Sequence, residues 1–165
     1  MEGKKSKPRA LLVFGAPCSG KTTFSEKFAE KFDLAYYNLD QITDEYHFKK
    51  TELLDVLKLI AKTRHTLVIE GGIDTEAERK KLKKMFMEAG YEVYLIWIQT
   101  DVVTIRMRMK MRYKSVAKAK DAYDALVGGM EAPTATERPI ILSGKHTFET
   151  QTKHVLAGLA DVNKR

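Results

Sequence analysis

One stretch of eight residues, positions 15–22, constrains the fold of this chain more than any other. It reads Gly-Ala-Pro-Cys-Ser-Gly-Lys-Thr and satisfies the pattern G-x-x-x-x-G-K-[ST] without a mismatch. A continuous apolar run, residues 10–14, precedes it, and residues 21–32 follow with a phenylalanine at every fourth position from Phe24. The sequence therefore predicts a buried strand, a glycine-rich turn and a helix in direct succession.

A turn of this kind binds phosphate groups. Its glycines let successive backbone N–H groups point inward, and the following helix adds its positive N-terminal end. Lys21 is predicted to reach the β- and γ-phosphates of ATP, and the Thr22 hydroxyl to bind Mg²⁺. Cys18 is interpreted either as an oxidation-sensitive thiol or as a small side chain that the loop tolerates. The predicted nucleotide-binding residues are Gly15, Ala16, Pro17, Cys18, Ser19, Gly20, Lys21, Thr22 and Thr23.

Strand-like and helical patterns alternate along the whole chain. This alternation predicts βαβ units, and hence a parallel sheet covered by helices on both faces, a three-layer α/β/α fold. The 165 residues suit one domain, 1–165. Further strands are expected at 34–39, 66–70, 93–98 and 139–142, and further helices around 53–61 and at 75–89, 101–112 and 147–160.

Two acidic residues stand where predicted strands end, and ligands of such sheets gather at these ends. Asp40 follows the second predicted strand, where a carboxylate can orient an acceptor hydroxyl and take its proton. The alternative for Asp40 is a helix N-cap. Glu70 closes the third predicted strand. It is predicted to support Mg²⁺, directly or through water, or to contact substrate, and the alternative is a solvated strand end.

A basic segment, residues 106–120, contains seven Lys and Arg and no acid, a local charge equal to the formal net charge of +7. It is either a solvated helix face or an anion-binding element. We predict that residues 106–131, which include Gly128-Gly129, form a short basic lid that closes over phosphates. Guanidinium groups stabilise transferring phosphoryl oxygens. The candidates are Arg108 and Arg112 as catalytic residues and Arg106 as a nucleotide contact.

The loop after the last predicted strand, residues 143–146, is predicted to approach the adenine base. Lys145 is its candidate nucleotide contact, and His146 is either a base or a residue that caps the last helix. The longest clearly apolar run, residues 93–98, is far shorter than the ~20 residues of a membrane helix. The basic stretch 1–9 is not followed by a signal-peptide pattern, and Cys18 has no second cysteine to pair with. We therefore expect a cytoplasmic protein with no membrane partner.

Residues 15–23 and Asn38-Leu39-Asp40 together resemble the small P-loop (Walker A) kinases, above all the AAA-type predicted kinases grouped with polynucleotide kinase and the zeta toxins. Their loop pattern G-x-P-x-S-G-K-[ST] is matched. In those families an Asp after strand two is the base on the acceptor hydroxyl, and Asp40 matches it. Glu70 stands where they more often have Asp, and Arg106 matches an arginine that leads into a mobile lid. The resemblance covers residues 9–112. It implies a five-stranded parallel sheet in the order 2-3-1-4-5 and transfer of phosphate from ATP to a hydroxyl group.

The acceptor is not identified by these patterns. A small-molecule or nucleotide kinase is the first hypothesis. A polynucleotide 5′-hydroxyl kinase is an alternative, favoured by the basic 106–120 segment, which makes nucleic acid a possible partner. A nucleotide-binding regulatory ATPase without an acceptor is another. A GTPase is disfavoured because no Asn-Lys-x-Asp motif is present.

Overall fold

The computed structural model describes residues 7–114 and 116–162. Most of the basic N-terminal stretch lies outside the described residues, as does Ser115 within the basic segment. Five parallel strands form one sheet in the order β2-β3-β1-β4-β5, so the predicted α/β class and strand order are confirmed. The strands are β1 Arg9–Phe14, β2 Ala35–Asn38, β3 Leu67–Glu70, β4 Glu92–Gln99 and β5 Ile140–Ser143.

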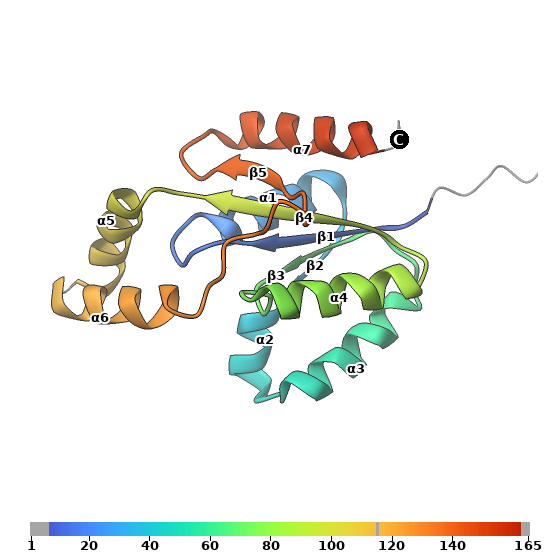
Figure 1. The fold of residues 1–165 in the computed structure, drawn as a ribbon, viewed down its shortest axis with the longest axis horizontal. Coiled ribbons are helices and arrows are strands. Elements are labelled where there is room, and N and C mark those ends of the chain that lie inside the picture. Colours follow the sequence, from blue (N-terminus) through green and yellow to red (C-terminus); the bar gives the residue numbers. More distant parts are fainter. Residues whose placement is uncertain (1–6, 115, 163–165) are drawn as a thin grey trace, which may run out of the picture.

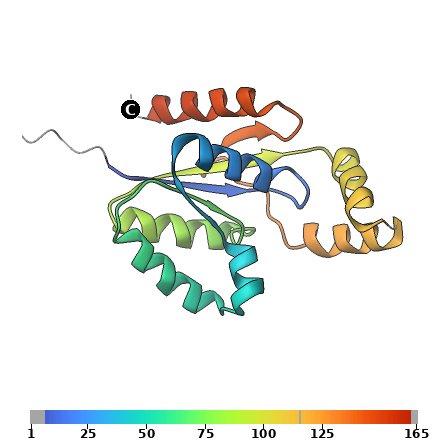
Figure 2. The same cartoon turned by 180° about the vertical axis from the view of Figure 1, so that it is seen from behind.

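Helices cover both faces of the sheet (Figures 1 and 2). Alternate residues of the central strand β1 point to opposite faces. Leu11 and Val13 belong to the core under helices α1 (Lys21–Phe32) and α7 (Phe148–Val162). Leu12 and Phe14 belong to the core on the other face, under α2 (Leu39–Tyr46), α3 (Lys50–Ala61) and α4 (Glu76–Glu88). A strand buried on both faces must be apolar at every position, which is why residues 10–14 carry no polar side chain.

The second strand is shorter than predicted, and this changes the setting of Asp40. The Asn38 side chain accepts a hydrogen bond from the backbone N–H of Gln41 at 3.1 Å, and so caps a helix, α2, that begins at Leu39. Asp40 therefore lies in the first turn of α2, and it is neither the last residue of a strand nor the N-cap. The strand ended earlier than the apolar pattern indicated, because its last residue, Asn38, is also the N-cap of α2.

Helices α5 (Val102–Tyr113) and α6 (Val116–Val127) extend beyond the carboxyl end of β4 (Figure 1). Asp101 caps α5 by accepting the N–H of Thr104 at 2.9 Å. Ile105 and Met109 are buried, with Ala16 and Cys18 of the phosphate loop packed against them. The sequence patterns predicted no helix at α6.

Candidate functional site

The loop between β1 and α1 owes its path to two glycines. Gly15 has a φ of 151°, and a Cβ there would collide with the carbonyl oxygen of Ile98 on β4. Gly20 has a φ of 104° and precedes α1, whose N-terminus has no side-chain cap. The Lys21 ammonium donates to the Ala16 carbonyl at 3.2 Å. The loop thus leaves the first N–H groups of α1 open to an anion, with a cation at its rim.

The first turn of α1 contacts the end of β3. The Thr22 hydroxyl donates to Glu70 Oε1 at 2.5 Å, and the Tyr36 hydroxyl donates to Glu70 Oε2 at 2.7 Å. Glu70 is only 2% exposed, so the alternative of a solvated strand end is wrong. Burial, followed by the hydrogen bond to Glu70, raises the pKa of Tyr36 well above its ordinary value. The carboxylate is therefore held by two hydroxyl donors beside the phosphate loop.

The sequence patterns did not indicate Tyr36 as a site residue, because its position depends on the sheet register. Tyr36 pairs with Val68 in the β2–β3 ladder, so its side chain lies on the same sheet face as those of residues 68 and 70. Which strand neighbours β3, and in which register, follows only from the assembled sheet.

Asp40 lies against the turn that follows β3. Its Oδ1 accepts the backbone N–H of Gly72 at 2.9 Å. Gly71, with a φ of 79°, lies so close that a Cβ there would collide with the Asp40 carboxylate. The Gly71-Gly72 pair therefore seats Asp40 and Glu70 at the same strand end. Burial raises the pKa of the nearby Asp74 carboxyl, the negative charge of Asp40 raises it further, and Lys21 opposes both effects. Asp40, Asp74 and Lys21 are thus within electrostatic reach of one another.

A cavity of about 500 Å³ lies on the other side of the phosphate loop. This volume is within the range of small-molecule sites, ~300–1,000 Å³. The loop and α1 supply Gly20, Lys21 and Thr22 to its lining, and α7 supplies Phe148 and Gln151. The remaining lining includes Arg108, Arg112, Gly144 and His146. The cavity therefore joins a cationic, phosphate-loop side to a side with an aromatic ring.

The three candidate arginines have different surroundings. Arg108 donates to the carbonyls of Cys18 at 3.1 Å and Ser19 at 3.2 Å, and from its other terminal nitrogen to Gly144 at 2.9 Å. It thereby links the phosphate loop to the loop after β5. Arg112 lines the cavity. Arg106 is not among the cavity-lining residues, and its guanidinium lies 5.1 Å from the centroid of the Tyr123 ring.

Lys145 does not line this cavity either, although its neighbours Gly144 and His146 do. Its ammonium pairs with the Asp101 carboxylate at 2.5 Å. The hydrogen bond from Lys145 holds the pKa of Asp101 well below its usual range. Of the loop after β5, Gly144 and His146 therefore line the cavity. Lys145 points instead to the carboxylate that caps α5.

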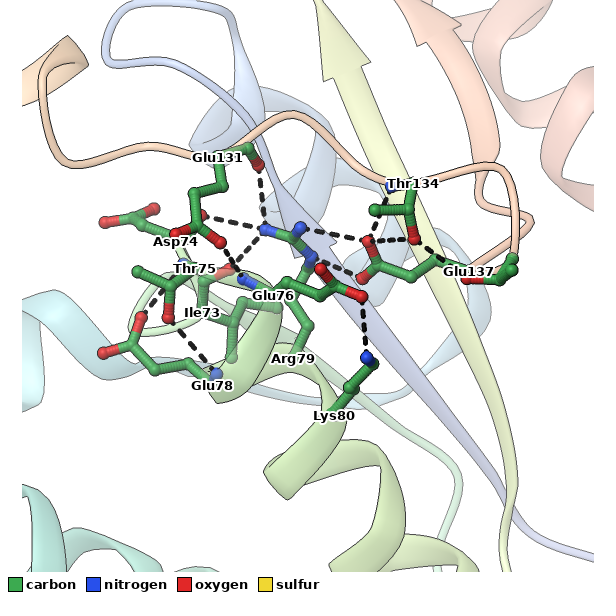
Figure 3. Close-up of polar contacts among 11 residues, drawn as sticks. Ile73, Asp74, Thr75, Glu76, Glu78, Arg79, Lys80, Glu131, Thr134 and Glu137 are labelled. Carbon is green, nitrogen blue, oxygen red and sulfur yellow. Dashed lines mark hydrogen bonds and ion pairs between the residues drawn. The ribbon is translucent and has the colours of Figure 1, made fainter.

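Arg79 is a completely buried charge at the centre of a polar cluster (Figure 3). Its Nε donates to Glu137 Oε1 at 2.7 Å, and its guanidinium lies 4.7 Å from the centroid of the Phe14 ring. Other N–H groups donate to the carbonyls of Asp74 at 2.9 Å and Glu131 at 3.0 Å. Arg79 thereby fixes the turn after β3 to the segment that returns from α6.

The Thr22 and Glu70 oxygens are a donor set that suits Mg²⁺, which prefers hard oxygen ligands and retains several waters. Their direct 2.5 Å contact brings two such ligands together at the phosphate loop. Within residues 7–114 and 116–162, no group of three or more His, Cys, Asp and Glu side chains is arranged to hold a metal ion. No helix in the same ranges has the length and hydropathy that crossing a membrane requires.

A family model described as an AAA domain matches residues 11–134. This match implies nucleotide binding through the phosphate loop. No curated protein matches the chain significantly.

Solved structures share the fold, and two of the three described here are named as kinases. A gluconokinase from Sinorhizobium meliloti 1021 aligns with a TM-score of 0.67 and 17% identity, over 96% of this chain and 95% of that chain. The APS kinase CysC of Mycobacterium tuberculosis, in complex with AMPPNP and APS, aligns with a TM-score of 0.67 and 14% identity, over 93% and 98%. Kti12 of Chaetomium thermophilum, in complex with ADP-AlF3, aligns with a TM-score of 0.65 and 15% identity, over 92% and 97%.

Proposed function

The chain belongs to the AAA domain family, and from this membership we propose that it is a kinase that transfers the γ-phosphate of ATP to the hydroxyl of a small molecule. The observation that carries the proposal is the pair of carboxylates at one strand end. Glu70 contacts the phosphate-loop residue Thr22, while Asp40 lies on the other side of the turn, on a backbone N–H group. Two acids in such different settings suit two roles, support of the nucleotide complex and activation of an acceptor.

The phosphate loop supports ATP as the donor. Ser19 is completely buried, and its hydroxyl has no hydrogen-bond partner among the described residues. A buried hydroxyl without a partner is costly, and a phosphate oxygen would supply the partner. Thr22 and Glu70 are the residues that would hold Mg²⁺, which neutralises charge on the β- and γ-phosphates when bound. The cavity of about 500 Å³ beside the loop would take the nucleoside.

The proposed step is an in-line displacement. The acceptor oxygen forms a bond to the γ-phosphorus as the bond from that phosphorus to the β,γ-bridging oxygen breaks. The bridging oxygen leaves with its electron pair as part of ADP. The acceptor proton passes to the Asp40 carboxylate and then to water. ATP and the alcohol thus give ADP, a phosphate monoester and one proton.

The basic lid remains part of the proposal. Arg112 and Arg108 lie on the side of α5 that faces the nucleotide cavity, and Arg108 already reaches the phosphate-loop carbonyls. If residues 106–131 move toward bound ATP, Arg108 would exchange carbonyl partners for phosphate oxygens. Polynucleotide as the acceptor is the second candidate, and the exposed lysines of the basic segment, among them Lys110 and Lys114, favour it.

Radiolabelled ATP distinguishes these possibilities. The purified protein is incubated with γ-labelled ATP and Mg²⁺ together with alcohols, sugars, nucleosides or 5′-hydroxyl oligonucleotides. Label transferred to a small molecule supports the proposal. Label transferred only to oligonucleotide, with a steep dependence on salt, supports the second candidate. Rapid ATP hydrolysis that no acceptor alters would contradict both, and would favour a regulatory ATPase.

A further inference from the structure

A second cavity, of about 220 Å³, lies on the side of the sheet that α2, α3 and α4 cover. Asp40 and Gly72 both belong to its lining, so the cavity begins where the proposed base lies. Its volume lies below the ~300–1,000 Å³ that is usual for small-molecule sites. The space therefore suits a small acceptor rather than a polymer.

One part of the cavity wall is apolar. Three helices and the turn after β3 supply six aliphatic residues, Leu39, Leu53, Leu54, Leu57, Ile73 and Leu82. Five of these six, all except Leu54, are at most 7% exposed and belong to the hydrophobic core on this face of the sheet. The body of the acceptor would therefore lie against a packed surface of side chains that offer no hydrogen bonds.

Six other lining residues carry polar side chains: Asp40, Thr43, Asp44, Lys50, Glu78 and Lys81. Thr43 and Glu78 are half-buried. Asp44, Lys50 and Lys81 are exposed residues. The Lys50 ammonium is paired with Glu78, whose carboxylate also accepts the backbone N–H of Thr75 at 3.1 Å. Asp40 is thus the group placed to receive a hydroxyl where the cavity meets the turn after β3. Hydroxyls on the part of an acceptor that faces the six aliphatic residues would have no hydrogen-bond partner there.

We propose that the acceptor is a small alcohol with an apolar body, which packs against the leucines while its single hydroxyl lies at Asp40. This inference rests on the proposed kinase function and narrows it to one substrate class. It sets this chain apart from a gluconokinase, although the fold is shared, because hydroxyls of a polyol that face the aliphatic residues would lose water without gaining partners. The transfer step is the displacement described above, with the alcohol oxygen as the attacking atom.

The test compares two apolar alcohols, benzyl alcohol and isoamyl alcohol, with glycerol and gluconate. Binding is measured by methyl NMR on the complete chain, and phosphate transfer is measured by the label from γ-labelled ATP. Apolar cavities discriminate against an added hydroxyl by up to ~10²-fold, so the apolar alcohols should be preferred by roughly 10- to 100-fold in both measurements. The methyl signals that shift should include those of Leu54.

Two variants on α3 locate the effect. Leu54→Asn places an amide in the cavity and should weaken binding of both apolar alcohols by roughly tenfold or more. Leu59→Asn is the matched control, because Leu59 is 61% exposed and does not line the cavity. It should bind the alcohols as the wild type does.

The outcomes separate this inference from the proposed function. Equal or stronger binding of glycerol or gluconate, no binding of either apolar alcohol, or equal effects of the two variants would each overturn the substrate class. Calorimetry with ATP and Mg²⁺ is performed on the same samples. If the wild-type protein does not bind ATP, the proposed kinase function is refuted. If it binds ATP but prefers glycerol or gluconate as the acceptor, only the proposed apolar acceptor is refuted.

Discussion

The Thr22 hydroxyl donates to the Glu70 carboxylate across 2.5 Å, and this contact joins the first turn of α1 to the end of β3. The two residues are 48 positions apart in the chain. They meet because β1, which leads into the phosphate loop, pairs directly with β3, with Val13 opposite Glu70. Two oxygen ligands thus lie together where a nucleotide-bound Mg²⁺ is expected.

Lys21→Ala should weaken ATP binding while the fold persists. Hydrogen bonds to charged groups contribute about 1.5–3 kcal/mol, so the affinity should fall by roughly 10- to 150-fold. Calorimetry with ATP and Mg²⁺ measures this change. Lys84→Ala, at a lysine on α4 whose side chain is 77% exposed, is the control and should leave the affinity unchanged. Unaltered ATP affinity and turnover in the Lys21 variant would refute the role of the loop.

Glu70→Gln should reduce the contribution of Mg²⁺ to ATP binding, because the variant loses the carboxylate charge but keeps nearly the same shape. ATP affinity measured without Mg²⁺ should change little, whereas the increase in ATP affinity on adding Mg²⁺ should become smaller. Tyr36→Phe removes one hydroxyl donor to Glu70 and leaves the charge, so its effect on this increase should be smaller. An equal loss of affinity with and without Mg²⁺ would show that Glu70 has only a structural role.

Asp40→Asn should reduce transfer to the acceptor by ~10²–10⁴-fold, the usual contribution of a general base. The amide oxygen can still accept the N–H of Gly72, so the turn should be preserved. ATP affinity should stay within about threefold, which is less than ~1 kcal/mol. Asn38→Ala, which removes the cap of α2, controls for a disturbed helix start. The assignment fails if Asp40→Asn transfers phosphate at the wild-type rate, and a collapse of ATP binding would move Asp40 to the Mg²⁺ site.

Glu137→Ala should lower the free energy of unfolding by about 3–5 kcal/mol, because it leaves the buried Arg79 guanidinium without its counter-charge. Urea unfolding at neutral pH measures this loss. Glu131→Ala is the matched control. That side chain accepts the N–H of Glu76 at the start of α4 in an exposed position, so its removal should cost only about 0.5–2 kcal/mol. Equal losses in the two variants would contradict the central role of the buried pair.

The buried ion pair of Arg79 and Glu137 should also make the free energy of unfolding depend on pH. The hydrogen bond from Arg79 holds the pKa of Glu137 below its ordinary value of about 4.3. The ionised carboxylate therefore stabilises the folded state in full above that ordinary value, and the contribution is lost as the pH falls through the folded pKa. Unfolding of wild type and Glu137→Gln is compared at neutral and acidic pH. Their difference should shrink toward acid, and a constant difference would rule out the linkage.

The sequence alone determined the fold class of this protein and most of its helices and strands. The eight-residue loop needs a buried strand before it and a helix after it, and the alternation of apolar runs with helical stripes requires a parallel sheet. Local signals, namely apolar period, glycines and caps, gave most element bounds to within a few residues. They failed at β2, where the Asn38 cap ended the strand early, and at α6, where they predicted no helix.

Only the tertiary structure decided which side chains meet. Strand register brought Tyr36 to Glu70, and the turn after β3 brought Gly72 to Asp40. An arginine side chain is long and flexible, so its position in a helix does not determine which group it contacts. Only the structure shows that Arg108 contacts the phosphate loop and that Arg106 contacts Tyr123. Lys145 pairs with Asp101, which is 44 residues away in the chain, and no spacing in the sequence indicates this contact. The periodicity of apolar residues predicts which face of a helix or strand is buried. The contacts of each side chain depend on the packing of elements that are distant in the sequence.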